Sequence, residues 1–111
     1  MFLAHDVTYT TTGNMPSVDF DPTIAPFNVS VGVTLTTGPA SYKLQYTLDD
    51  FSDPLKTDAS AVWFDSTEIP AATAATIFAG LTRPVTRARL VIATLTAGSL
   101  RMQTLQSFSK N

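Results

Sequence analysis

The sequence contains no cysteine, so neither a disulfide framework nor a thiolate metal site can form. Stability must come from a hydrophobic core instead, and 44% of the residues are hydrophobic. A chain of 111 residues is long enough for one such core and too short for two ordinary ones. We therefore expect a single domain that spans residues 1–111.

Long apolar runs are also missing. No stretch approaches the ~18 consecutive apolar residues that a membrane-spanning helix needs. The first residues, Met1 to Asp6, lack the basic region of an export signal. The sequence therefore predicts neither a membrane partner nor export.

Charged residues make up only 14% of the chain, against roughly 25% in an average soluble domain. A surface rich in Thr, Ser, Gln and Ala costs little to desolvate and suits extended contact with other proteins. We therefore expect a homo-oligomer or a larger assembly. The net charge of −2 argues against a nucleic-acid partner, because phosphate binding needs clustered Lys and Arg.

Acidic residues are absent after Glu68. Nine acids and two lysines give residues 1–68 a charge of −7, and four arginines and one lysine give residues 69–111 a charge of +5. These segments attract each other, either within one fold or head-to-tail between copies in a ring or lattice. The residues that we assign to such contacts are Arg83, Arg87, Arg89 and Arg101 on the basic side, and Asp49, Asp50 and Asp53 on the acidic side.

A catalytic constellation is missing as well. His5 is the single histidine, and no Gly-x-Ser-x-Gly elbow is present to expose a nucleophile. A lone imidazole near the start of the chain cannot supply a base together with its nucleophile and orienting acid. We expect no enzyme activity, no catalytic residue and no cofactor.

Strict alternation of apolar and polar residues is the clearest pattern present, and it predicts strands at 27–37 and 42–48. Gly38 and Pro39 between them indicate a turn. The pattern predicts a hairpin with coincident apolar faces, in which the opposed pairs are Leu35 with Tyr42, Val33 with Leu44, and Val31 with Tyr46.

A second hairpin is predicted from 85–95 and 100–108, with its turn at Ala97 to Ser99 and its register left open. The first arm is apolar on both faces, which is typical of a central or covered strand. Weaker strands are expected at 6–12, 62–64 and 76–79, and a long loop at 49–61.

These elements predict an all-β fold: a two-sheet antiparallel sandwich of seven or eight strands, with jelly-roll-like connections and no helix longer than about two turns. Residues 1–26 are expected to form an edge strand or a partner-binding arm. The predicted core residues are Val31, Val33, Leu44, Tyr46, Leu90 and Ile92.

Three carboxylates lie within five positions at Asp49, Asp50 and Asp53, and hard cations such as calcium prefer such ligands. The loop lacks the glycine and the closing glutamate of a helical calcium site, so we interpret these aspartates as turn residues that cap local N–H groups. The pair Asp19 and Asp21 is interpreted in the same way. We predict no metal site.

Arg87 and Arg89 share one face of an otherwise apolar strand. Two interpretations stay open: their stems extend along the strand end so that the guanidinium groups reach water, or they pair with carboxylates of the same or another copy. Trp63 and Phe64 either fill the core or offer a stacking surface for a sugar.

Several segments together resemble small structural proteins from tailed bacteriophage particles. The resemblance covers roughly the last two-thirds of the chain, through Tyr42–Asp50, Trp63-Phe64-Asp65, Pro84–Leu90 and the closing strands around Gly98 that end in Leu105-Gln106. The N-terminal third departs from it.

The resemblance implies a compact β-sandwich without enzyme activity, made in the host cytoplasm and located in the virion. Its partners would be the major capsid protein or other virion proteins, together with neighbouring copies, in a decoration or cement role. A head-tail connector or tail component is the alternative in the same class. A carbohydrate-binding sandwich module is the alternative from another class.

Overall fold

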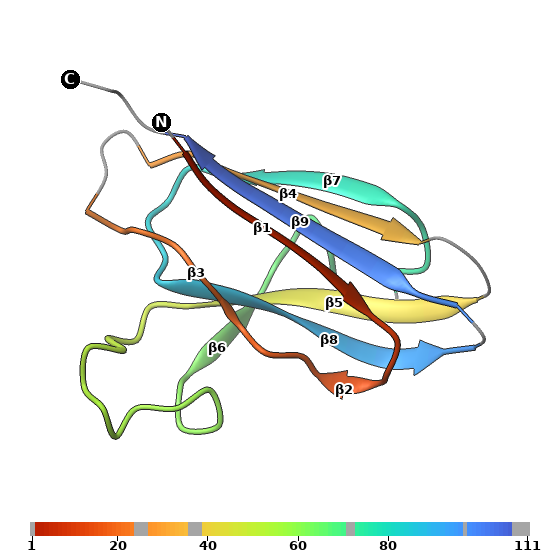
Figure 1. The fold of residues 1–111 in the computed structure, drawn as a ribbon, viewed down its shortest axis with the longest axis horizontal. Coiled ribbons are helices and arrows are strands. Elements are labelled where there is room, and N and C mark those ends of the chain that lie inside the picture. The colour runs from red at the N-terminus through yellow and green to blue at the C-terminus, as the bar shows by residue number, and fades with distance from the viewer. Residues whose placement is uncertain (1, 24–26, 36–38, 71–72, 97, 108–111) are drawn as a thin grey trace.

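The computed structural model describes residues 2–23, 27–35, 39–70, 73–96 and 98–107 (Figure 1). These residues contain nine strands and no helix. The strands are β1 (Phe2–Tyr9), β2 (Gly13–Asn14), β3 (Val18–Asp19), β4 (Val29–Leu35), β5 (Ala40–Thr47), β6 (Trp63–Asp65), β7 (Ile77–Leu81), β8 (Arg87–Leu95) and β9 (Leu100–Ser107).

The strands form two antiparallel sheets that pack face to face (Figure 1). Sheet A has the order β1-β9-β4-β7, and sheet B has the order β2-β8-β5-β6, with β3 also paired to β8. Successive strands mostly alternate between the two sheets, which is the connectivity of a jelly roll. The predicted all-β sandwich is confirmed.

The core lies between the sheets and is built by alternation along the strands. In β4 and β5, buried and partly exposed residues alternate except at the strand ends, where Leu35 is partly exposed and Thr47 is buried. All six residues predicted for the core are buried, at 9% exposure or less. The ring of Tyr42 also lies in this core, and its hydroxyl donates a hydrogen bond to the carbonyl of Ala75.

The two predicted hairpins are wrong as strand pairings. Val33 of β4 lies opposite Met102 of β9 and Ile77 of β7, within sheet A. Leu44 of β5 lies opposite Leu90 of β8, within sheet B. The consecutive strands β4 and β5 therefore belong to different sheets, and β8 and β9 do as well. Their apolar faces meet across the core, which buries the same side chains as a hairpin would.

The turn residues predicted at Gly38 and Ala97 lie outside the described residues. The expectation that 85–95 is a central strand is confirmed, because β8 lies between β5 and the short strands β2 and β3. The weaker strands predicted at 6–12, 62–64 and 76–79 correspond to β1, β6 and β7. β1 forms one edge of sheet A, and β7 forms the other.

Candidate functional site

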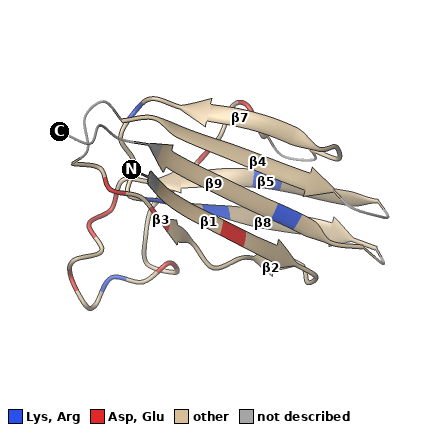
Figure 2. Ribbon diagram, turned by 45° about the horizontal axis from the view of Figure 1, so that its top comes forward, with Lys and Arg blue, Asp and Glu red and all other residues tan. Residues whose placement is uncertain are grey.

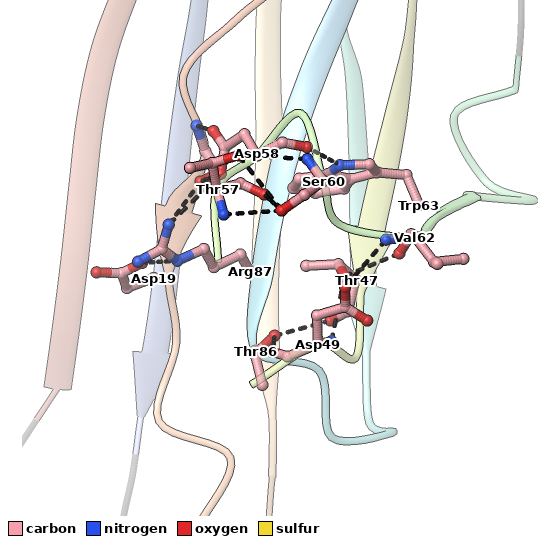
Figure 3. Close-up of polar contacts among 11 residues, drawn as sticks. Asp19, Thr47, Asp49, Thr57, Asp58, Ser60, Val62, Trp63, Thr86 and Arg87 are labelled. Atoms are coloured by element: carbon pink, nitrogen blue, oxygen red, sulfur yellow. Dashed lines mark hydrogen bonds and ion pairs between the residues drawn. The ribbon is translucent and has the colours of Figure 1, made fainter. Parts of the chain in front are cut away.

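Arg87 of β8 points away from the core and contacts acids from two other segments of the chain (Figure 3). Its Nε is 2.6 Å from Asp19 Oδ1, and its Nη1 is 3.4 Å from Asp58 Oδ1. Asp19 reaches it because β3 pairs with β8 and places the two residues opposite each other. The ring of Phe51 lies 3.8 Å from the guanidinium carbon, a cation–π contact.

Asp58 anchors the loop at 48–62 to the rest of the domain through hydrogen bonds (Figure 3). Its carboxylate accepts hydrogen bonds from the Ser17 N–H at 3.1 Å and the Ser17 hydroxyl at 2.8 Å. Its backbone carbonyl accepts a hydrogen bond from Trp63 Nε1 at 2.8 Å. Together with Arg87, these contacts hold the long loop against β8 and against the segment between β2 and β3.

Arg89 also lies on the outer side of sheet B, and it is buried. Its guanidinium carbon is 4.1 Å from the centre of the Trp63 ring, and its Nε donates a 3.0 Å hydrogen bond to Gln45 Oε1. Burial lowers the pKa of Arg89. Both arginines are thus stacked on aromatic rings, which is an arrangement that the sequence analysis did not predict.

Gln45 links Arg89 to a surface ion pair. Its Nε2 donates a 2.9 Å hydrogen bond to Asp65 Oδ1, while Lys43 Nζ lies 3.3 Å from the same oxygen. The hydrogen bonds from Gln45 and then Lys43 lower the pKa of the Asp65 carboxyl. β5 and β6 bring these groups together by pairing Gln45 with Asp65.

The acidic loop residues mainly satisfy local backbone groups. Asp50 Oδ1 accepts a hydrogen bond from the Ser52 N–H, and Asp53 Oδ1 accepts one from the Leu55 N–H, both at 2.9 Å. Asp49 Oδ2 accepts the Val62 N–H at 3.1 Å and lies 3.3 Å from Lys56 Nζ. The contacts of Asp50 and Asp53 agree with their interpretation as turn residues, whereas Asp49 spans the loop and binds the N–H of Val62, 13 positions away. Within the part of the chain that the structure describes, no three His, Asp or Glu side chains are grouped to hold a metal ion.

Arg101 pairs with Asp6 on the outer side of sheet A. Its Nε and Nη2 donate hydrogen bonds of 2.8 Å and 2.5 Å to the two carboxylate oxygens. These hydrogen bonds lower the pKa of Asp6 and raise that of Arg101. Arg87 and Arg101 therefore both meet acids of the 1–68 segment within one chain, and a contact between copies through either residue stays a prediction.

Arg83 is exposed, and no ion pair with another described residue involves it. It lines an open cavity of about 380 Å³ beside the ends of β5 and β7, together with Leu48, Phe64 and Glu68. The ring of His5 lies at the surface, where its Nε2 is 3.0 Å from the backbone carbonyl oxygen of Asp19.

The outward-pointing residues of sheet A form a neutral surface, which we call the sheet A face. Two of its eleven residues are charged, and they are the Asp6–Arg101 pair described above (Figure 2). The face consists of Ala4, Asp6 and Thr8 of β1; Ser30, Gly32 and Thr34 of β4; Phe78 and Gly80 of β7; and Arg101, Gln103 and Leu105 of β9.

Apolar side chains are exposed on the sheet A face around Gly32. Phe78 is 74% exposed and Leu105 is 43% exposed. Both line an open depression of about 560 Å³, together with Gly32 and Gln103. A Cβ on Gly32 would meet only Phe78 Cδ2, at the ordinary contact distance of 3.9 Å. Alternation along 27–37 placed Gly32 on the polar face of its strand, but the sequence analysis did not predict that Phe78 and Leu105 adjoin it.

Comparisons with known proteins give little further information. No family model matches the sequence, and no curated protein matches it. Among solved structures, the chain is similar to one described as "Bacillus endospore appendages form a novel family of disulfide-linked pili". The identity is 12%, the TM-score is 0.36, and the match covers 97% of this chain and 89% of that chain. At this score the likeness supports no conclusion about function.

In the described residues, no helix is both long and apolar enough to cross a membrane.

Proposed function

We propose that this protein is a non-enzymatic structural protein of a tailed-phage particle, and that it works by contacts with the capsid surface and with neighbouring copies. The role that we propose first is decoration or cementing of the shell. In that role the protein would be made in the host cytoplasm and reside in the virion. The sequence resemblance supports the particle class. The contact chemistry of the surface supports the manner of working.

The observation that supports this proposal most is the sheet A face. Across four adjoining strands its charges are limited to the Asp6–Arg101 pair, whose members neutralise each other. Small uncharged residues, Gln103 and the exposed Phe78 and Leu105 make up the rest. Such a face loses little solvation free energy when covered and gains from the burial of its apolar side chains.

The sugar-binding alternative receives less support from the aromatic residues. Phe51 and Trp63 each have a guanidinium group stacked on the ring, at 3.8 Å and 4.1 Å from the ring centres. A sugar that stacked on those same ring faces would first have to displace Arg87 or Arg89. The connector or tail alternative uses the same kind of contact, and differs in the partner and in the symmetry of the assembly.

The proposal is tested by co-sedimentation of the protein with empty phage shells. Gly32→Arg places a long cation at the centre of the sheet A face, where the added Cβ fits without displacement. We expect wild-type protein to sediment with the shells and Gly32→Arg to lose at least tenfold in affinity, because an unpaired charge would be buried. Thr94→Arg is the matched control, because Thr94 is exposed on β8 of sheet B.

Each result has a distinct meaning. Loss of binding in Gly32→Arg with binding retained in Thr94→Arg supports docking through the sheet A face. Equal binding by both variants contradicts docking through that face. If the wild-type protein does not bind shells but binds tails, the connector or tail alternative is supported. If it binds a glycan array instead, the sugar-binding alternative is supported.

A further inference from the structure

Within the described part of the chain, the two edges of sheet A are regular strands without a backbone partner on their outer sides. β7 pairs with β4 alone, and β1 pairs with β9 alone. Among the described residues, no further backbone hydrogen bond reaches either strand. β7 has the sequence Ile-Phe-Ala-Gly-Leu. It therefore lacks the charged residues and prolines that usually protect an edge strand from pairing.

Sheet B differs from sheet A in this respect, because its edges are short. β2 and β3 have two residues each and β6 has three. Beyond β6 the chain follows β5 through isolated contacts: the Ser66 N–H donates to Leu44 O, and Tyr42 and Thr73 form one isolated bridge. Short and irregular edges are a known protection against strand addition. The free edges that remain open to pairing are thus β1 and β7.

These two edges match each other in direction. Sheet A has four strands, and each is antiparallel to its neighbours. β1 and β7 therefore run in opposite directions, so a second copy placed beside the first in the same orientation presents its β1 antiparallel to β7. The hydrogen-bonding pattern also matches, because hydrogen-bonded and non-hydrogen-bonded pairs alternate across a row of antiparallel strands. Because sheet A has four strands, a pair formed by β7 and the β1 of the next copy continues this alternation without interruption.

The side chains match as well. Rows run straight across sheet A without a bulge, so Leu81 shares a row with Leu3, and Ile77 shares one with Val7. A copy added in this register places its Leu3 beside Leu81 and its Val7 beside Ile77. Leu3 is 40% exposed and Val7 is 37% exposed in the single chain. The contact would cover these apolar side chains with apolar neighbours.

Charge favours the same arrangement. The exposed Arg83 follows the Leu81 end of β7 by two residues. In the second copy, that end meets the Leu3 end of β1, where hydrogen bonds from Gln106 hold the backbone of Asp21 and the Asp21 carboxylate accepts hydrogen bonds from Thr23. Gln106 lies opposite Leu3 in sheet A. A cation without an ion-pair partner in the described chain thus approaches a carboxylate of the next copy.

We propose that copies of this protein join head-to-tail by pairing β7 of one copy with β1 of the next, in the register that sets Leu81 opposite Leu3 and Ile77 opposite Val7. This contact adds a specific interface to the proposed structural role, and its location in a particle rests on that proposed role. It does not depend on what the sheet A face binds. A five-residue strand gives less area than a stable interface needs, so each contact is weak alone and gains strength where copies are held close together.

The twist of β-sheets determines the form of such an assembly. Adjacent strands rotate by roughly 20–25°, so four strands rotate the next copy by about 80–100°. Head-to-tail copies therefore wind about the direction of growth rather than spread into a flat layer. Within the proposed structural class, this geometry favours the tail or connector alternative wherever more than two copies are joined.

The test uses paired cysteines, which the natural chain lacks. Leu81→Cys with Leu3→Cys places thiols at both edges of one chain, three strand spacings or roughly 14 Å apart, too far for a disulfide within the chain. At high protein concentration we expect mild oxidation to give a ladder of dimers, trimers and longer species. Ile77→Cys with Val7→Cys should give the same ladder.

The control is a mismatched pair, Leu81→Cys with Val7→Cys, whose thiols lie about four residues, or roughly 13 Å, out of register. A ladder from the matched pairs and its absence from the mismatched pair supports the proposal. An equal ladder from both, or no ladder from either matched pair, overturns it. Dimers from Leu81→Cys alone, as abundant as the ladder, would instead indicate β7 paired with β7 and also overturn it.

A second measurement covers the case in which the cysteines disturb folding. Hydrogen exchange of the wild-type protein should slow in the amides of β1 and β7 as concentration rises, while the β2 and β6 amides stay unchanged. Exchange that is independent of concentration in all four strands overturns the proposal. Shell binding is measured separately with Gly32→Arg, so loss of the edge contact and loss of the proposed function remain distinguishable.

Discussion

The side-chain amide of Gln106 forms two hydrogen bonds to the backbone of Asp21, 85 positions away in the sequence. Its Oε1 accepts the Asp21 N–H at 2.8 Å, and its Nε2 donates to the Asp21 carbonyl at 2.7 Å. Gln106 is fully buried on β9. One polar side chain in the core thus anchors the segment that follows β3.

Replacement of Gln106 should detach that segment. Gln106→Ala leaves two backbone groups without partners, and we expect a loss of about 1–3 kcal/mol in the free energy of unfolding. Urea denaturation measures it. Gln103→Ala on the same strand is the control, because Gln103 is exposed on the sheet A face. An equal effect of both changes would contradict the anchoring role.

Truncation in the core should be costly where the two sheets meet. Leu44 is fully buried on β5. Leu44→Ala removes buried methyl groups and leaves a cavity, so we expect the free energy of unfolding to fall by about 2–5 kcal/mol. Thr94→Ala, at an exposed position of the neighbouring β8, should leave it nearly unchanged. Chemical denaturation of both variants checks the expectation.

Removal of Arg87 should loosen the loop at 48–62. Arg87→Met loses the ion pairs with Asp19 and Asp58 and the cation–π contact with Phe51. We expect faster proteolysis within the loop and a loss of roughly 1–2 kcal/mol in stability, because the site is partly buried. Arg83→Met is the matched control at an exposed arginine. If the loop is cleaved at the wild-type rate in Arg87→Met, these contacts do not hold it.

The Asp6–Arg101 pair predicts a dependence of stability on pH. Hydrogen bonds from Arg101 lower the pKa of Asp6 below its ordinary value of 3.8. The unfolded chain therefore takes up this proton first, so the pair stabilises the fold above pH 3.8, and its contribution disappears as the pH falls through the folded-state pKa. We expect Asp6→Asn to melt below wild type at pH 7 and the difference to vanish in stronger acid. A difference in melting temperature that persists in strong acid would show that Asp6 stabilises the fold through packing and not through its charge.

Calcium should not bind tightly at the acidic loop. The carboxylates of Asp49, Asp50 and Asp53 each accept a backbone N–H, which fixes them toward the chain. Titration calorimetry should show no binding tighter than about the millimolar range. A micromolar isotherm that Asp50→Asn abolishes would reveal a site.

The fold was largely predictable from alternation, but the pairing of strands was not. The pattern at Val31, Val33 and Leu44 shows which side chains face a core. It does not show whether consecutive strands lie side by side in one sheet or face each other across two, because both arrangements bury the same residues. The strands β2 and β3 escaped prediction because two residues are too few to show a period.

The sequence predicted that the arginines pair with acids of the earlier segment, but it did not predict which acids. The absence of acids after Glu68 indicated that Arg87 and Arg101 meet acids of the earlier segment, and Asp19, Asp58 and Asp6 supply them. Which acids do so depends on strand register and on the path of a long loop, and neither has a local sequence signal. The aromatic rings beneath Arg87 and Arg89 were missed for the same reason.

The alternation of strands between sheets sets the order in which the chain can fold during synthesis. β9 is an inner strand of sheet A, with β1 and β4 on its two sides, and β8 holds the same position in sheet B. Of the strand pairs that the described residues form, only β5 with β6 joins neighbours in the sequence, across the loop at 48–62. Neither sheet can therefore close until residues 87–107 have left the ribosome. Slow, non-local pairing of this kind leaves the uncharged β7 exposed on the nascent chain, where it needs shielding from aggregation.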